Sequence, residues 1–183
     1  MADVPGAADH LDEVASLVDS LTELGLEPIL VGGMAMVIIG SRRVTRDFDF
    51  VIPQPGERLQ RLVEVFYGRG LELAARVNRA GDVTATIDNP RVAVTRLRFD
   101  APSSAYFLNP ETGLRIDLLF DFPVPAAELA KGARRTKIRS RAMRVASEGD
   151  LLRLKKIARA QRSAPGDAED VAFLESRRRR KPR

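Results

Sequence analysis

Residues 44–52, Val-Thr-Arg-Asp-Phe-Asp-Phe-Val-Ile, place the strongest constraint on the fold, because polar and apolar side chains alternate along most of them. In a β-strand, residues two apart point to the same face of the sheet. Four polar side chains therefore share one face of the predicted strand: Arg43, Thr45, Asp47 and Asp49. The phenylalanines on the opposite face need a hydrophobic core, so one face of the strand is buried and the other stays polar.

The two aspartates of this strand lie about 7 Å apart at Cα, since a strand rises roughly 3.3–3.4 Å per residue. Like charges at this distance repel, and one carboxyl group tends to stay protonated unless a cation lies between them. A divalent cation removes the repulsion and leaves positions open for water and phosphate, as magnesium prefers. The alternative is an exposed edge strand whose acids pair with neighbouring arginines: Arg42, Arg43 and Arg46.

A glycine pair precedes this strand. Residues 28–31 predict a short buried strand, Gly32-Gly33 a turn, and residues 34–39 an apolar helix. Glycine lets a backbone approach a phosphate closely, and the exposed N–H groups of such a turn and helix start attract anions. The segment therefore predicts a phosphate site beside the two aspartates, with the arginines of residues 42–46 as further phosphate ligands.

A third carboxylate lies on a separate strand, predicted over residues 114–122. Asp117 is a lone charge in an otherwise apolar run, and a buried carboxylate is costly unless it is paired. We expect Asp117 to complete a three-carboxylate cluster with Asp47 and Asp49. Asp121 has the same strand parity and is the alternative.

The remaining pattern predicts an α+β fold with a mixed or antiparallel sheet flanked by helices. Apolar residues at helical spacing predict helices over 8–24, 55–67, 126–131, 148–161 and 167–176. Runs bounded by turn residues predict strands over 71–77, 83–87, 92–99 and 114–122. We expect a core (1–125), a C-terminal helical part packed on that core (126–176) and a disordered basic tail (177–183).

Composition narrows the chemistry. The 183 residues include no cysteine and one histidine, His10, which excludes disulfides and thiolate zinc sites and disfavours a Ser-His-Asp triad. A metal must then be held by oxygen, which favours magnesium or manganese. The longest uncharged apolar run, residues 30–40, is about half of the roughly 20 residues that a bilayer needs. The first ten residues do not resemble a secretory signal, so we expect a cytoplasmic protein.

Charge is divided unevenly along the chain. Residues 1–125 contain 12 arginines, no lysine and 18 acidic residues, a net charge of −6. Residues 126–183 contain 18 basic and 7 acidic residues, a net charge of +11. The basic part indicates an anionic partner. The alternative is a solvated helical surface followed by a basic tail.

Residues 31–52, VGGMAMVIIGSRRVTRDFDFVI, resemble the signature of the DNA polymerase β-type nucleotidyltransferase superfamily. That signature is a Gly-Gly or Gly-Ser turn, a helix, an Asp-x-Asp strand and a third carboxylate on a later strand. The matching residues are Gly32, Gly33, Asp47, Asp49 and Asp117. Arg43 and Thr45 extend the resemblance to the AbiEii/MenT-like toxin nucleotidyltransferases. Met34 departs from the pattern, because a small hydroxyl residue often follows the glycines.

The toxin enzymes also carry a Leu-x-x-x-Lys helix followed by Asp-x-x-Asp, which residues 151–155 and 167–170 resemble. Helical spacing places Lys155 on the apolar stripe of its helix, and Asp167 and Asp170 on one face of the next. Two interpretations stay open. Lys155 reaches the phosphates of a nucleotide while an aspartate positions it, or the three side chains form a buried ion pair that joins the last two helices.

The resemblance implies a metal-dependent nucleotidyltransferase that moves an NMP from an NTP to an acceptor hydroxyl, with two magnesium (or manganese) ions as cofactors. The implied nucleotide-binding residues are Gly32, Gly33, Arg43, Thr45 and Lys155. The implied catalytic residues and metal ligands are Asp47, Asp49 and Asp117, supported by Asp167 and Asp170. The implied acceptor is RNA, notably the tRNA 3′ end, and the implied biology is a toxin with an antitoxin protein as partner. A protein hydroxyl or an antibiotic as acceptor, and a non-catalytic NTP- or RNA-binding module, are the alternatives.

Overall fold

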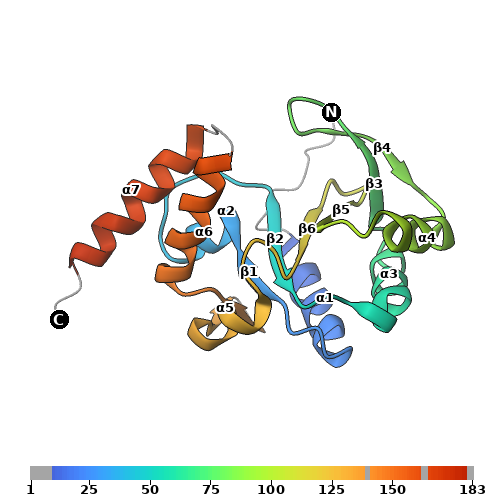
Figure 1. Cartoon of the computed structure of the whole chain (residues 1–183), viewed down its shortest axis with the longest axis horizontal. Helices are drawn as coiled ribbons and strands as arrows, with labels where there is room; N and C mark the ends of the chain where they lie inside the picture. The colour runs from blue at the N-terminus through green and yellow to red at the C-terminus, as the bar shows by residue number, and fades with distance from the viewer. Residues whose placement is uncertain (1–9, 139–140, 162–164, 181–183) are drawn as a thin grey trace.

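The computed structural model describes residues 10–138, 141–161 and 165–180, which form an eight-stranded mixed sheet with helices packed around it (Figure 1). The strands are β1 (Ile29–Val31), β2 (Asp47–Ile52), β3 (Glu72–Val77), β4 (Val83–Ile87), β5 (Ser104–Leu108), β6 (Arg115–Phe120), β7 (Arg134–Ile138) and β8 (Arg141–Val145). The helices are α1 (Leu11–Glu23), α2 (Gly32–Ile38), α3 (Leu59–Tyr67), preceded by the 3-10 turn η2 (Gly56–Arg58), α4 (Pro90–Asp100), α5 (Ala126–Gly132), α6 (Glu148–Gln161) and α7 (Pro165–Arg180). The predicted α+β class is confirmed.

The order of the strands across the sheet is β4-β3-β5-β6-β2-β1-β8-β7. β2 pairs in parallel with β6 and β1 in parallel with β8, while the other neighbours are antiparallel. The sheet is therefore mixed, and β2, the strand that carries the Asp-x-Asp motif, lies between β6 and β1 near its centre.

The alternation in β2 produces the expected apolar face. Phe48 is buried and lies beside Ile116 of β6, which in turn lies beside Phe107 of β5. The ring of Phe66 from α3 packs on Phe107 with a centroid distance of 4.2 Å. Each such side chain stabilises the fold by roughly 1.5–3 kcal/mol on full burial. Because α3 covers this face, the aspartates of β2 point to the opposite face of the sheet.

The C-terminal part is not wholly helical, which corrects the prediction for residues 126–176. β7 and β8 extend the sheet, and β8 pairs with β1 through Ile29 opposite Arg144. Met143 and Val145 are buried, and the same hydrophobic core continues into α6 and α7. The sequence hides these strands because basic residues dominate them and only one face of β8 meets the core.

Residues 92–99 form the helix α4, so the predicted strand there is wrong. Valines favour a strand by propensity, but the start of the segment is a helix cap. The side chain of Asn89 accepts hydrogen bonds from the backbone N–H groups of Arg91 and Val92, and Pro90 occupies the first helical turn. The buried face has helical spacing: Ala93, Val94 and Leu97.

Two further segments differ from the prediction. Residues 104–108 form β5, a strand that the sequence pattern did not predict because Ala-Pro-Ser-Ser, residues 101–104, indicates a turn and overlaps its first residue. α7 continues to Arg180, so the predicted disorder of the basic tail is wrong for residues 177–180. Arg177 donates a 3.0 Å bond to Glu148, which ties this end of α7 to α6. Residues 181–183 lie outside the described residues.

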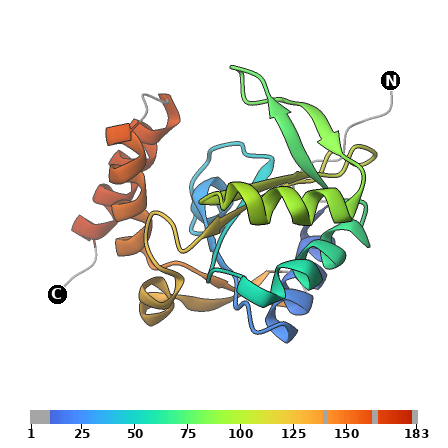
Figure 2. The ribbon, with the colours of Figure 1, turned by 45° about the vertical axis from the view of Figure 1, so that its right-hand side comes forward.

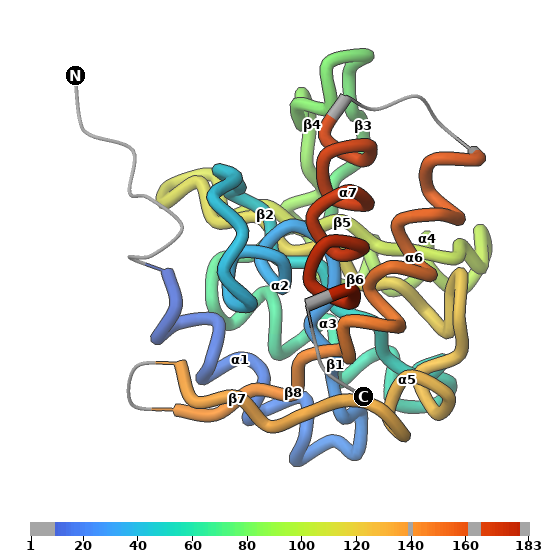
Figure 3. Tube along the Cα trace, turned by 90° about the vertical axis from the view of Figure 1, so that its left-hand side faces the viewer, coloured from blue at the N-terminus to red at the C-terminus, as the bar shows by residue number. Residues whose placement is uncertain are grey.

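α6 and α7 pack side by side at the end of the molecule away from the β3–β4 hairpin, as Figures 1 and 2 show. Viewed from that end, α7 and α6 lie in front of α2 (Figure 3), and α6 contacts α2. The last two helices thus approach the glycine turn at the start of α2. Among the described residues, no helix has the length and apolar character that crossing a membrane requires.

Candidate active site

Three aspartates share the polar face of two neighbouring strands. The parallel pairing of β2 with β6 sets Asp49 directly beside Asp117 and Asp47 beside Arg115. Paired residues of adjacent strands point to the same face, and the strands are about 4.7–4.9 Å apart. The structure therefore brings the three predicted carboxylates together across a single gap between strands.

Asp49 explains why residue 32 is a glycine. Gly32 has a φ of +65°, in the left-handed region that favours glycine. A Cβ added to Gly32 would lie 1.9 Å from Oδ2 of Asp49, which is a severe overlap. Val31, the preceding residue, pairs with Asp49 across β1 and β2. The carboxylate of Asp49 thus fills the space that a side chain at position 32 would need.

Gly33 makes room for two more of the predicted residues. A Cβ on Gly33 would lie 2.8 Å from Oγ1 of Thr45 and 3.3 Å from Cζ of Arg43, so both side chains lie against the turn. Nε of Arg43 is buried and donates no hydrogen bond to any described residue, although its Nη1 pairs with Asp170. α2 has only seven residues, so we do not assign an anion site to its N-terminus alone. The guanidinium of Arg43 is therefore the main group at this turn that attracts an anion.

A buried ion-pair network lies behind Arg43. Nζ of Lys155 is 2.7 Å from Oδ2 of Asp170 and 3.1 Å from Oδ1 of Asp167. The Lys155 side chain is 10% exposed and those of the two aspartates 4%. Asp170 also pairs with Arg43, so the network joins α6 and α7 to the segment before β2. This geometry agrees with the ion-pair interpretation of the C-terminal motif, because the two aspartates enclose the ammonium group.

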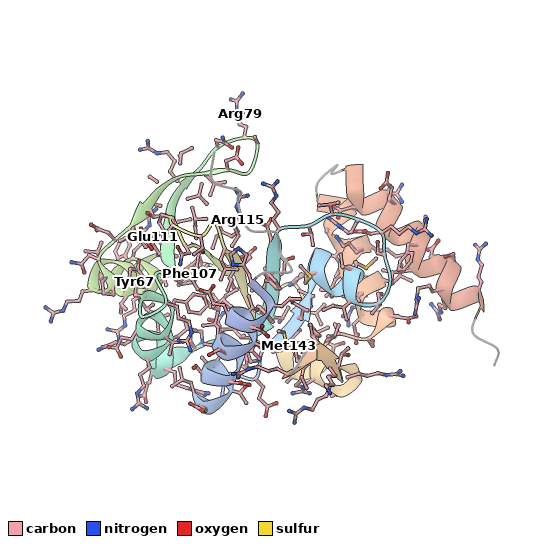
Figure 4. All side chains as sticks on the ribbon, turned by 180° about the vertical axis from the view of Figure 1, so that it is seen from behind. Tyr67, Arg79, Phe107, Glu111, Arg115 and Met143 are labelled. Carbon is pink, nitrogen blue, oxygen red and sulfur yellow. The ribbon has the colours of Figure 1, made fainter. Side chains whose placement is uncertain are left out.

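Two further residues, which the sequence motifs do not include, also face the carboxylates. Tyr106 of β5 pairs with Asp117 in register, and Arg115 precedes Asp117 by two residues, so both lie on the same face of the sheet. The Arg115 guanidinium lies 4.0 Å from Oδ1 of Asp47 and 3.9 Å from Oδ1 of Asp82, in the turn between β3 and β4. Figure 4 shows Arg115 on the side of the sheet toward the β3–β4 hairpin, whose turn is marked by Arg79.

The electrostatics of this face are uneven. Burial raises the pKa of Asp47 above its ordinary value of 3.8, against the opposing effects of the Arg115 charge and a hydrogen bond from Tyr106. Burial, followed by the charge of Asp47, raises the pKa of Tyr106 to about 12. Tyr106 therefore stays a neutral phenol at neutral pH. Ionised Asp47 lowers the stability of the native state, because burial disfavours its charge.

The donor set is suited to a hard cation. All three carboxylates offer the oxygen ligands that magnesium and manganese accept. Oδ1 of Asp47 is buried and accepts no hydrogen bond within the described parts of the chain, so a ligand has an unsatisfied oxygen to meet there. In residues 10–138, 141–161 and 165–180, however, no three acidic or histidine side chains form a preformed metal cluster. The three aspartates thus occupy neighbouring positions on β2 and β6, but their side chains do not converge closely enough to form a metal site without movement.

Asp121, the alternative to Asp117, has a different position. It follows β6 with a φ of +50°. Its carboxylate accepts hydrogen bonds from the backbone N–H groups of Gln54, at 3.0 Å, and Ala126, at 2.8 Å. These bonds fix the loop between β6 and α5, so Asp117 is the third carboxylate of the polar face.

Comparison with solved structures shows that the chain has the nucleotidyltransferase fold. It is similar to the lincosamide antibiotic adenylyltransferase LnuA in a lincomycin-bound structure, with 15% identity over 91% of this chain and 96% of that chain and a TM-score of 0.57. It is similar to ANT(2″)-Ia in complex with adenylyl-2″-tobramycin, with 15% identity over 91% and 87% of the two chains and a TM-score of 0.55. An antigenic nucleotidyltransferase-like protein from Paracoccidioides brasiliensis matches with 18% identity over 91% and 75% and a TM-score of 0.56.

At the level of sequence, no family model and no curated protein matches the chain. The similarity to nucleotidyltransferases therefore rests on the fold, which agrees with the fold that the Gly-Gly and Asp-x-Asp motifs predicted. The narrower resemblance to AbiEii/MenT-like toxins stays a prediction.

Proposed function

We propose that this protein is a nucleotidyltransferase that moves an NMP from an NTP to an acceptor hydroxyl and releases pyrophosphate. One observation carries the proposal: Asp49 and Asp117 are side by side in register, and Asp49 fills the space above Gly32. In a fold shared with adenylyltransferases, carboxylates that lie beside a glycine turn support this proposal. Nucleotidyl transfer needs such an arrangement because positioning and charge neutralisation supply most of the catalysis.

The triphosphate of the NTP binds at Gly33, with Thr45 and Arg43 as its polar ligands. Support comes from the free donor of Arg43: its Nε has no hydrogen-bond acceptor within the described residues, and a charged hydrogen bond is worth roughly 1.5–3 kcal/mol. Asp170 holds the other side of the guanidinium. We assign Lys155 to the positioning of Asp170, in place of direct contact with the nucleotide.

Asp47, Asp49 and Asp117 are the residues that would hold magnesium or manganese. Bound there, the ions would neutralise phosphate charge and lower the pKa of the attacking hydroxyl. The chain itself supplies the rest. Gly33 and Arg43 orient the phosphates, and the register of β2 and β6 fixes the spacing of the carboxylates. The attacking oxygen then needs to lie roughly in line with the leaving pyrophosphate.

RNA, notably a tRNA 3′ end, is the acceptor that we place first, because the net charge of residues 126–183 is +11. Part of this charge is paired with acidic residues in the fold: Arg141 with Asp19, Arg144 with Glu27, Arg153 with Glu128, and Lys156 with Glu175. The unequal totals still leave cations in excess. A role as the toxin of a toxin–antitoxin pair, with an antitoxin protein as partner, is part of this proposal.

An antibiotic acceptor is the second candidate. Structures of similar fold include an adenylyltransferase with lincomycin bound and one with adenylylated tobramycin. Tobramycin is cationic, and the net charge of −6 over residues 1–125 is compatible with such an acceptor.

The test is transfer of label from each α-labelled NTP, with magnesium, to total tRNA, tobramycin or lincomycin. We expect transfer to RNA that falls by at least about 100-fold in Asp49→Asn and Asp117→Asn, while Asp121→Asn, outside the carboxylate face, keeps the wild-type rate. Labelled antibiotic in place of RNA would favour the second candidate. NTP binding without transfer to any acceptor, unchanged in both aspartate variants, would identify a non-catalytic module.

A further inference from the structure

The polar face extends beyond the three carboxylates on one side. From β1 across the sheet, the order is the Gly32–Gly33 turn, the aspartates of β2, Asp117 and Arg115 of β6, and Tyr106 of β5. Arg43 and Thr45 lie at the glycine end of this row. Arg115 and Tyr106 therefore lie on the other side of the carboxylates from the proposed triphosphate site.

The geometry of nucleotidyl transfer suggests that the acceptor binds on the side of Arg115 and Tyr106. In nucleotidyl transfer the attacking and leaving oxygens are roughly in line at the α-phosphorus. Pyrophosphate that leaves toward Gly33 and Arg43 requires the acceptor to approach from the opposite direction, across β6 and β5. The first side chains that such an acceptor meets are Asp117, Arg115 and Tyr106.

Arg115 lies near two carboxylates, but neither makes a close ion pair with its guanidinium. Its guanidinium is 4.0 Å from Asp47 and 3.9 Å from Asp82, at the outer limit of an ion pair, and its side chain is 28% exposed. Tyr106 lies beside it on the same face of the sheet, in register with Asp117, two residues further along β6. A guanidinium in this state keeps donors for a further anion, and its planar fork suits the oxygens of a phosphate.

We infer that Arg115, oriented by Tyr106, is the acceptor subsite of this enzyme and binds the last phosphodiester of an RNA acceptor, next to the 3′-hydroxyl that reacts. This inference rests on the proposed function and selects RNA among its acceptors. Tyr106 acts here as a positioning residue for Arg115. The reaction at this site joins the acceptor oxygen to the α-phosphorus, breaks the bond to pyrophosphate and releases the hydroxyl proton to solvent.

The experiment measures binding of an unreactive RNA, so that it does not depend on catalysis. A fluorescent RNA oligonucleotide ending in a 3′-deoxynucleoside is titrated at fixed salt, in the presence of magnesium and a non-hydrolysable NTP analogue. A second oligonucleotide differs only by a neutral methylphosphonate in the last linkage. Wild type, Arg115→Gln, Tyr106→Phe and the control Arg98→Gln, an exposed arginine of α4, are compared with both probes.

We expect the neutral linkage to raise the Kd of wild type by about tenfold. Arg115→Gln raises the Kd for the natural RNA by a similar factor and binds both probes equally, because the lost contact is the same one. Tyr106→Phe gives a smaller rise that disappears in the double variant with Arg115→Gln, and Arg98→Gln keeps the wild-type preference.

The inference would be overturned if Arg115→Gln raised the Kd of both probes by the same factor and so kept the wild-type preference for the natural linkage. An unchanged Kd for the natural RNA would also overturn it. Displacement of the RNA by tobramycin, lost in Asp82→Asn, would overturn it in favour of a cationic acceptor. Failure of the proposed function is a separate result: the phosphate-dependent binding persists, and no NTP yields labelled RNA.

Discussion

Replacement of Lys155 by methionine tests which interpretation of the C-terminal motif is correct. The change keeps the length and apolar stem of the side chain and removes the ammonium group that lies 2.7 Å from Asp170 and 3.1 Å from Asp167. Removal of one partner of a buried ion pair costs about 3–5 kcal/mol, because a charge stays buried without compensation. Asp170 keeps its bond to Arg43, so we expect a loss near the lower end, about 3 kcal/mol.

Urea unfolding followed by circular dichroism at pH 7 measures this loss, and for a chain of this size it corresponds to a fall in Tm of roughly 6–12 °C. Lys156→Met is the matched control. Nζ of Lys156 lies 2.9 Å from Glu175, but the two side chains are 55% and 40% exposed, so its removal should cost less than about 1 kcal/mol. Similar small losses for both variants, together with weaker NTP binding by Lys155→Met alone, would refute the ion-pair assignment and make Lys155 a phosphate ligand.

Three further predictions concern the turn and the carboxylates. Gly32→Ala should abolish transfer and destabilise the fold by at least about 1–3 kcal/mol by urea unfolding, since its Cβ would displace the Asp49 carboxylate; activity near wild type would contradict the packing of this turn. Asp47→Asn without divalent cations should raise the free energy of unfolding at pH 7. Burial raises the pKa of Asp47, so the native state favours its protonated form and the wild type loses stability as pH rises through that pKa. Below pH 3.8 the carboxyl is protonated in both states, and Asp47→Asn should then be no more stable than the wild type. A stability gain that does not change with pH would show that the Asp47 charge is not its cause. Arg43→Ala and Asp170→Asn should each raise the KM for NTP, and the double variant should be no worse than Arg43→Ala alone; additive losses would show that Asp170 acts elsewhere.

The carboxylate face was predictable from the sequence because its signals are local and chemical. Alternation in residues 47–50 fixed the faces of β2, and the cost of a lone buried charge singled out Asp117. Nothing in the pattern specified that β6 pairs with β2 in parallel, yet this pairing is what sets Asp117 beside Asp49. Register is a long-range property, so the sequence indicated the members of the site and left their contacts to the fold.

Tyr106 and Arg115 were missed for different reasons. Tyr106 belongs to β5, whose start follows turn-forming residues, and an unpredicted strand gives its side chains no assigned face. Arg115 has the same parity as Asp117, so its place on the polar face was available from the spacing alone. The valines of α4 led to the wrong prediction of a strand, because the Asn89 cap outweighs their preference for a strand.

The pairing of β1 with β8 has a consequence for the order of events during synthesis. β1 has three residues, directly precedes the glycine turn, and receives its outer neighbour from residues 141–145. A ribosome that has translated the aspartate motif and its partner strand has therefore not yet provided the segment that flanks β1. The turn beside the aspartates should therefore gain its full support late in translation, only after residues 141–145 have left the ribosome.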